Sequence, residues 1–418
     1  MALLFLCLIF GTGRTQKIEA AVQNVPESLE EESRLDTVGT DQETERAAVR
    51  EKKGQQEKEA GDTETDQAAA AQDELLAELD FDAIQQEVDS LLSSQQFSFA
   101  GTVRSLLQDG DPFRTFRAGN AVLSCAKTAF LAQKGLMKEL FLLVLAGAVL
   151  GSFSSLFEGK QVRDASFYMV YLLALALILK NFQSSGENLK AVITSLVAFM
   201  RILTPSYYRA AAAAGGASSA VMFYQMLLLV ILAVEKLLLA LVLPMIHIYL
   251  LIALVNDLSG EEILSHMTEL LETCVNGLLK SSLGVLVGMQ MIRNLIAPAL
   301  DSLRQMALWR TAGMIPGIGN AVNAVTELVA GSAVLIRNCF GVTAMLVLLA
   351  AGMVPAVQLL VSGLSFRLLA AAAQPVSDKR IAGCLAAAGK GYAMLLRLLL
   401  TVEILFLLTI AILAGTFS

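Results

Sequence analysis

The sequence predicts an all-α membrane protein, a polytopic bundle of about six to eight transmembrane helices with a disordered acidic N-terminal region. Hydrophobic residues make up 55% of the 418 residues, and the mean hydropathy is +0.62. Charged residues make up only 17%, against roughly 25% in soluble domains. Apolar runs near the ~20 residues that cross a hydrocarbon core recur between Leu136 and Thr416. A water-soluble fold could not cover this much apolar surface.

The first 16 residues are predicted to be a signal peptide. A short apolar run, Ala2–Phe10, is followed by Gly11, Gly13 and a polar region, which is typical of a secretory signal. A charged n-region is missing and no clear small-x-small cleavage site precedes Gln16. A short anchor or a mis-called start is therefore an alternative interpretation.

Acidic residues dominate the region that follows. Residues 17–90 hold 22 Asp and Glu against seven Lys and Arg, and residues 17–72 have almost no aromatic side chains. Such a segment cannot bury enough apolar area to offset the entropy of ordering it, so we expect residues 17–72 to be disordered. Residues 91–418 are mildly basic and lack a basic patch able to neutralise many phosphates, which argues against nucleic acid as a partner.

Residues 73–136 are predicted to form amphipathic helices. The first has apolar residues at roughly helical spacing, and it either packs on its own protein or docks a partner. Its apolar residues are Leu76, Leu79, Ala83, Val88 and Leu91. The second, over residues 113–136, mixes Phe and Leu with four basic side chains, so it can lie in the headgroup plane. Positive charge before a first span favours the cytoplasm, whereas a signal peptide would export this region. We favour export, which makes residues 73–136 extracytoplasmic.

The polytopic membrane domain is predicted over residues 137–418. Its candidate spans are Leu140–Leu156, Phe167–Leu179, a weak Ala191–Leu203, Val221–Val234, Leu237–Val255, Leu283–Ile296, Ala324–Ala351, Val354–Ala373 and Leu395–Ala414. The adjacent charges Glu235 and Lys236 predict a tight turn at a membrane face. The segment Glu261–Leu279 is amphipathic and is predicted to rest on the surface or against the bundle.

Two glycine pairs with a spacing of four residues fit close helix packing. Gly147 and Gly151 lie in the first span, and Gly284 and Gly288 lie in a later one. Small residues at this spacing allow backbones to approach closely. We expect both pairs to pack helices within the bundle.

Catalytic and metal-binding motifs are not found in the sequence. The five cysteines are far apart, and the two histidines lack a second ligand at helical spacing, so no metal site is predicted. The Gly389-Lys390 pair lacks the rest of a phosphate-binding loop. Neither GxSxG nor HExxH occurs. We therefore expect no enzyme activity and no cofactor.

The most informative stretch is a helix break followed by a polar stripe. Pro316, Gly317 and Gly319 interrupt any helix, and a new helix opens toward Phe340. The stripe consists of Asn320, Asn323, Glu327 and Asn338, with Arg337 beside it. These residues fall near one helical face, and buried polar groups in hydrocarbon must face a bundle interior, a partner helix or water. The stripe is either structural pairing or a solute or ion path. Glu403, in the last span, is a weaker candidate of the same kind.

The C-terminal half resembles the stage III sporulation protein AE family of endospore-forming bacteria. The resemblance rests on Ile315–Gly319, Glu327–Ser332 and Arg337–Val342, and on the order of segments from Pro355 to Gly415. It covers roughly residues 80–418, and residues 17–72 lie outside it.

This resemblance implies a role in sporulation. Members of the family are exported, polytopic proteins of the mother-cell membrane that surrounds the forespore. They act with the other stage III A proteins, and stage II sporulation protein Q contacts that assembly from the forespore side. The implied function is a permease-like membrane subunit of a channel or secretion-type complex that supports late forespore development. The alternatives are an independent secondary transporter, which the broken helix suggests, and a purely scaffolding subunit.

Overall fold

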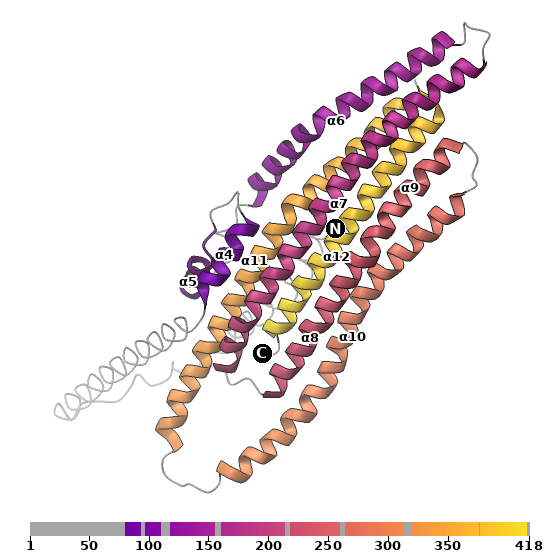
Figure 1. Cartoon of the computed structure of the whole chain (residues 1–418). Coiled ribbons are helices and arrows are strands. Elements are labelled where there is room, and N and C mark those ends of the chain that lie inside the picture. The colour runs from indigo at the N-terminus through magenta and orange to yellow at the C-terminus, as the bar shows by residue number, and fades with distance from the viewer. Residues whose placement is uncertain are drawn as a thin grey trace, which may run out of the picture. The chain divides into compact units, whose positions relative to one another are not determined.

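The structure is a computed structural model in which the following parts of the chain are described (Figure 1). They are residues 80–92, 97–109, 118–154, 160–213, 218–259, 264–312, 319–375 and 377–415. The predicted signal peptide and the acidic region 17–72 lie outside the described residues.

All secondary structure in the described part of the chain is helical, which confirms the predicted all-α class. The elements are α4 (Phe81–Leu91), α5 (Phe99–Asp109), α6 (Ala118–Ser154), α7 (Lys160–Ala213), α8 (Ser218–Leu237), the π-helix η1 (Leu238–Val242), α9 (Leu243–Ser259), α10 (Ser265–Ala312), α11 (Gly319–Ala373) and α12 (Lys379–Gly415).

Several of these helices are much longer than a bilayer is thick. Helices α7, α10 and α11 have 54, 48 and 55 residues. At 1.5 Å per residue they extend about 70–80 Å, whereas a hydrocarbon core measures about 30 Å. A bilayer can therefore cover only part of each of these helices.

Five segments of the described chain have the length and the apolar composition needed to cross a membrane. They are Phe167–Tyr207, Gln225–Ser259, Ser265–Ile292, Gly331–Ala373 and Lys379–Ile412. The chain is thus a multi-pass membrane protein, and the expected number of six to eight spans is only approximate.

The predicted turn at Glu235 and Lys236 is wrong. Helix α8 continues through both residues into η1 and then α9 without a break, and the N–H of Leu243 donates to the carbonyl of Leu238. Pro244 supplies a physical reason, because it has no N–H for the carbonyl four residues before it and its ring would clash with that carbonyl. The wider π turn directly before Pro244 accommodates the proline while the helix continues.

Other runs that were expected to be separate are joined into single helices. Phe167–Leu179 and Ala191–Leu203 both lie in α7, and the amphipathic segment from Ser265 to Leu279 continues into Leu283–Ile296 within α10. Ala324–Ala351 and Val354–Ala373 form one helix, α11, which contains Pro355. Charged residues interrupt an apolar run in the sequence, but they do not interrupt a helix that has packing partners along its length.

Contacts between residues fix the direction of the packed helices. Helices α11 and α12 are antiparallel, because Gly363 lies against Tyr392 while Gly352 lies against Glu403. They run side by side along the bundle, and α12 also contacts α7, α8, α9 and α10 (Figure 1). The α12 segment is the most buried of the five candidate spans, and the α10 segment is the least buried. The core of the bundle is therefore built around α12, with α10 at its edge.

The short helices α4 and α5 pack on the bundle through aromatic side chains. The ring of Phe99 lies 5.0 Å from that of Phe340 in α11, and Phe81 lies 6.2 Å from the same ring. Tyr207 of α7 approaches Phe340 at 6.3 Å. Ile84 of α4 is fully buried. Helix α4 therefore packs on its own chain.

Gly147 of the first glycine pair differs from both glycines of the second pair. A Cβ at Gly147 would lie 3.1 Å from Cγ1 of Val170, so this glycine allows α6 to approach α7 closely. A Cβ at Gly284 or Gly288 would meet no atom of the described residues within 4 Å. The expectation that Gly284 and Gly288 pack helices within the bundle is wrong, because they lie on the open side of the edge helix α10.

Candidate functional site

The predicted helix break coincides with the junction between two helices. Helix α10 ends at Ala312 and α11 begins at Gly319, and Pro316 and Gly317 lie between them, outside the described residues. Asn320, Asn323 and Glu327 follow within the first turns of α11. Only their backbone is described, so the role of their side chains stays a prediction.

The two C-terminal members of the predicted group lie on different sides of α11. Arg337 is 1% exposed and is among the largest fully buried side chains of the protein. Asn338 is exposed, as is Gly331 two turns earlier on the same face. The structure therefore places Arg337 in the core near Phe340 and leaves Asn338 on the outer surface. Arg337 and Asn338 therefore do not belong to one group of neighbouring side chains.

A cluster around Tyr392 joins α7, α11 and α12, and the sequence interpretation did not find it. The Nδ2 of Asn181 donates to the Tyr392 hydroxyl at 2.6 Å, and the Ser185 hydroxyl lies 3.2 Å from the same oxygen. The Tyr392 ring stacks on Phe366 of α11 at 5.2 Å and meets Phe182 edge-on at 5.2 Å. Polar atoms that would be costly inside an apolar bundle thus satisfy one another between helices.

His247 of α9 fits against the same cluster because position 186 is glycine. A Cβ at Gly186 would lie 2.6 Å from both Cε1 and Nε2 of His247. The imidazole ring meets Phe182 at 5.3 Å, and its Nδ1 lies 2.8 Å from the carbonyl of Leu243. This nitrogen therefore carries the proton and donates it to a carbonyl acceptor, which holds the ring in place.

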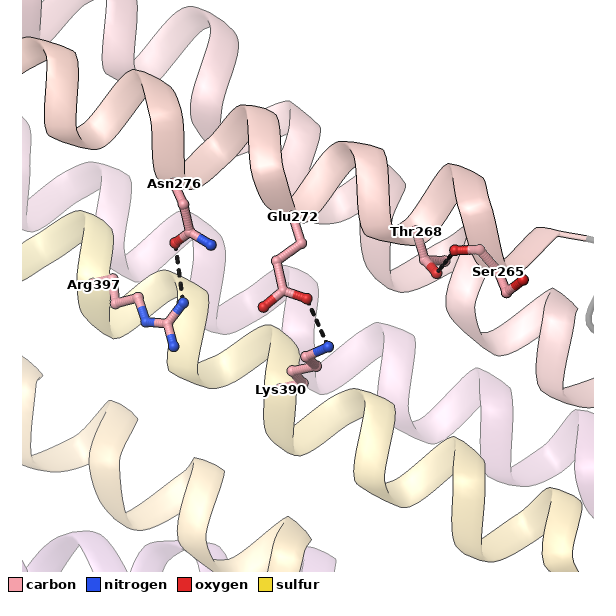
Figure 2. A network of polar contacts seen from close by, with 6 residues as sticks. All are labelled: Ser265, Thr268, Glu272, Asn276, Lys390 and Arg397. Carbon is pink, nitrogen blue, oxygen red and sulfur yellow. Dashed lines mark hydrogen bonds and ion pairs between the residues drawn. The ribbon is translucent and has the colours of Figure 1, made fainter.

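An ion pair and a hydrogen bond also connect the edge helix α10 to the central helix α12 (Figure 2). Lys390 Nζ lies 2.6 Å from Glu272 Oε2, and Arg397 Nη1 donates to Asn276 Oδ1 at 3.0 Å. Figure 2 shows Glu272 and Asn276 one turn apart on α10, each pointing toward its basic partner on α12. The ion pair and the hydrogen bond set the register of α10 on α12. The two helices run parallel, because the later residue of α10 meets the later residue of α12.

A third group of contacts lies where α9 ends and α12 begins. The Tyr171 hydroxyl donates to the carbonyl of Leu254 at 2.6 Å. Arg380 donates to the carbonyl of Leu258 at 3.4 Å, and its guanidinium carbon lies 5.5 Å from the centre of the Phe167 ring. The Leu258 carbonyl is one of the last four of α9, which lack a partner within the helix.

Two carboxylates are buried within candidate spans. Glu235 of α8 is 3% exposed and Glu403 of α12 is 8% exposed. Glu403 lies against Gly352 of α11, where a Cβ would come within 2.5 Å of the carboxyl carbon. Within the described residues, no group of three His, Cys, Asp or Glu side chains could hold a metal ion.

The residues missed by the sequence interpretation carried a weak signal. Asn181, Lys390 and Arg397 are polar residues within long apolar helices, which is the pattern that marks functional or structural polar contacts in membrane proteins. The sequence does not say which of them meet, because Asn181 and Tyr392 are separated by 211 positions. That pairing depends on the packing of α7 against α12.

Comparison with known proteins assigns a family to this bundle. The family model described as stage III sporulation protein AE matches residues 97–416. The chain is also similar to the stage III sporulation protein AE of Bacillus subtilis (strain 168), with 22% identity over 291 residues. That alignment covers 69% of this chain and 73% of the relative. No solved structure matches the chain.

Proposed function

Because this chain belongs to the stage III sporulation protein AE family, we propose that it is the permease-like membrane subunit of a sporulation channel or secretion-type complex. The family gives the chain a role in sporulation, and we place the protein in the mother-cell membrane that surrounds the forespore. There it supports late forespore development. The observation that carries this proposal is the family match over residues 97–416, which includes all five candidate spans.

The packing of the bundle supports a role in passage or assembly. Polar side chains meet between apolar helices at Tyr392 and between α10 and α12. Such contacts hold membrane helices in one register without a hydrophobic driving force between them. We infer that such a subunit positions a solute path or a partner protein. We assign no reaction and no cofactor to it.

The proposed partners are the other stage III A sporulation proteins in the same membrane and, indirectly, stage II sporulation protein Q, together with the lipid bilayer. An affinity tag on the C-terminus of the full chain, expressed from its own locus in sporulating cells, tests this proposal. We expect the other stage III A proteins to co-purify after mild solubilisation. Purification of the chain without them, under conditions in which they co-purify with one another, would contradict the subunit assignment.

The predicted stripe distinguishes a path from a scaffold. Glu327→Ala and Asn338→Leu each remove a polar group from α11. If either variant assembles with its partners but abolishes late forespore activity, a path along this face is supported. Loss of assembly indicates a scaffolding role. Purified protein that moves a solute across vesicles unaided would favour an independent secondary transporter instead.

A further inference from the structure

The exposed face of α7 changes its chemistry at Lys180. Before this residue most exposed side chains are large and hydrophobic, with Met169 76% exposed and Leu172 53% exposed. From Lys180 to Thr194 the exposed side chains are polar or charged except for Ala191, and we call five of them the α7 polar stripe. The stripe consists of Lys180, Gln183, Glu187, Lys190 and Thr194.

The opposite face of the same stretch is a continuous apolar seam. Its buried residues alternate at spacings of three and four, which is the pattern of a helix packed along one side. They are Phe182, Gly186, Leu189, Ile193, Leu196, Met200, Leu203 and Tyr207. This seam fixes the rotation of α7, so the α7 polar stripe must point away from the bundle core.

The neighbouring helices are mainly apolar on their outer side at the same level, with Lys236 as an exposed charged residue there. Gly186 contacts His247, and α7 runs antiparallel to α9 because Tyr171 meets Leu254 farther along. The part of α7 that follows Gly186 therefore lies level with the part of the chain that precedes His247, namely η1 and the end of α8. There Leu237 and Leu241 are 48% and 44% exposed.

The segment Gln225–Ser259, which contains η1, is also the most apolar of the candidate spans, with a mean hydropathy of 2.7. An outer face of this composition is suited to lipid. At the level of the α7 polar stripe, the outer face of α8 and η1 is therefore compatible with lipid, whereas the outer face of α7 is charged.

Charged side chains do not face hydrocarbon in membrane proteins, where they turn to a bundle interior, a partner or a water-filled space. The hydrogen bonds of the stripe stay within α7, since Gln183 donates to Glu187 at 3.1 Å and Thr194 donates to the carbonyl of Lys190 at 2.8 Å. Within the described residues, no interhelical hydrogen bond or ion pair covers Gln183, Glu187 or Thr194. Their hydrogen bonds within the described residues therefore leave the outer side of the stripe without a partner helix.

We propose that the α7 polar stripe borders an aqueous path at the level of the membrane, while the outer face of α8, η1 and α9 contacts lipid. This inference rests on the proposed function and deepens it, because a channel subunit needs one face for water and another for lipid. The water-facing surface it proposes lies on α7, and it is tested independently of the predicted stripe of α11.

Cysteine accessibility in membrane vesicles tests the proposal. The starting protein is the full chain with its five native cysteines replaced, and single cysteines are then introduced as Gln183→Cys, Thr194→Cys, Leu241→Cys and Ile248→Cys. All four positions are on the surface, so none of the substitutions disturbs the core. The probe is a charged, membrane-impermeant maleimide applied to open vesicles, and its rate of reaction is measured by a mass tag on the remaining free thiols.

We expect Gln183→Cys and Thr194→Cys to react at least ~10-fold faster than Leu241→Cys and Ile248→Cys, because a maleimide reacts with the thiolate and a thiolate forms in water. Equal, fast reaction at all four positions would place this level outside the membrane and overturn the proposal. Slow reaction at the α7 positions would overturn it as well.

The outcome can be separated from that of the proposed function. The accessibility pattern is measured in vesicles and does not depend on sporulation. If the pattern is as expected but deletion of the gene leaves forespore development normal, the water-facing surface stands and the sporulation role fails. If deletion blocks development but the α7 cysteines do not react, the role stands and the α7 path is wrong.

Discussion

At the scale of single residues, this bundle depends on close fits between glycines and large polar side chains. Gly186 leaves room for the His247 ring, and Gly352 leaves room for the Glu403 carboxyl. A side chain at either glycine would have to displace a polar group from a packed interior.

We expect Gly186→Ala to destabilise the protein by about 1–3 kcal/mol, the usual range for adding atoms to a well-packed core. The added Cβ would lie 2.6 Å from two atoms of the His247 ring. Thermal unfolding of the purified protein in detergent measures the change. The matched control is Gly135→Ala, because no atom of the described residues lies within 4 Å of a Cβ there. The double variant Gly186→Ala with His247→Ala should recover most of the lost stability. A Gly186→Ala protein as stable as the control would show that Gly186 is not needed to make room for His247.

The sequence predicts which residues are unusual at this scale, but not where they go. Polar residues in apolar helices stand out in the sequence, and Glu403 was found in this way. Gly284 and Gly288 have the spacing of a packing motif, yet they face outward, whereas Gly147 packs on Val170. Spacing defines a face of a helix, and only the neighbouring helix decides whether that face is covered.

At the scale of elements, the helices are longer than the apolar runs that they contain. A helix continues as long as its backbone hydrogen bonds between near neighbours continue, whether or not the side chains are apolar. Hydropathy predicts the runs well, and it places Leu395–Ala414 within α12. It fails at Glu235 and Lys236, where a pair of charges suggested a turn. The helix instead continues through a single wide turn at η1, and Glu235 is buried within it.

Hydrogen bonds of the Gln85 side chain join α4 to the start of α5, beside the contact between the Phe81 and Phe99 rings. The Gln85 amide donates to the carbonyl of Phe97 at 2.7 Å and accepts from the N–H of Phe99 at 2.8 Å. We expect Gln85→Ala to cost the hairpin about 0.5–1.5 kcal/mol for each lost bond. Hydrogen exchange at the Phe99 amide should accelerate accordingly.

The control for this prediction is Gln85→Glu, which keeps an acceptor for the Phe99 N–H but has no donor for the Phe97 carbonyl. Its Phe99 amide should exchange more slowly than in Gln85→Ala. Equal exchange in all three proteins would show that the aromatic contacts alone hold the hairpin.

The ion pair between Glu272 of α10 and Lys390 of α12 allows a second prediction at this scale. Glu272→Lys places two like charges opposite each other, so we expect a loss of stability, and the swap Glu272→Lys with Lys390→Glu should restore it. The effect is about 1 kcal/mol or less in water, since the Lys390 side chain is 51% exposed. Limited proteolysis of α10 in vesicles measures it. A swapped protein no more resistant than the single variant would show that the pair does not position α10.

At the scale of the whole molecule, composition alone predicts a helical membrane protein, because no soluble fold covers so much apolar surface. The order of segments in the C-terminal half identifies the family, and the family match over residues 97–416 agrees with it. The arrangement of the helices could not be predicted, since the contacts that define it join residues far apart in the chain. Asn181 with Tyr392 and Glu272 with Lys390 are examples.

The central claim is that this membrane bundle serves the developing forespore. Deletion of the gene in its host, with a late forespore-specific reporter and forespore volume followed after engulfment, tests it most directly. The account predicts normal vegetative growth, a silent reporter and a shrinking forespore, all restored by the full-length gene. Normal reporter activity and normal spores in the deletion strain would contradict it.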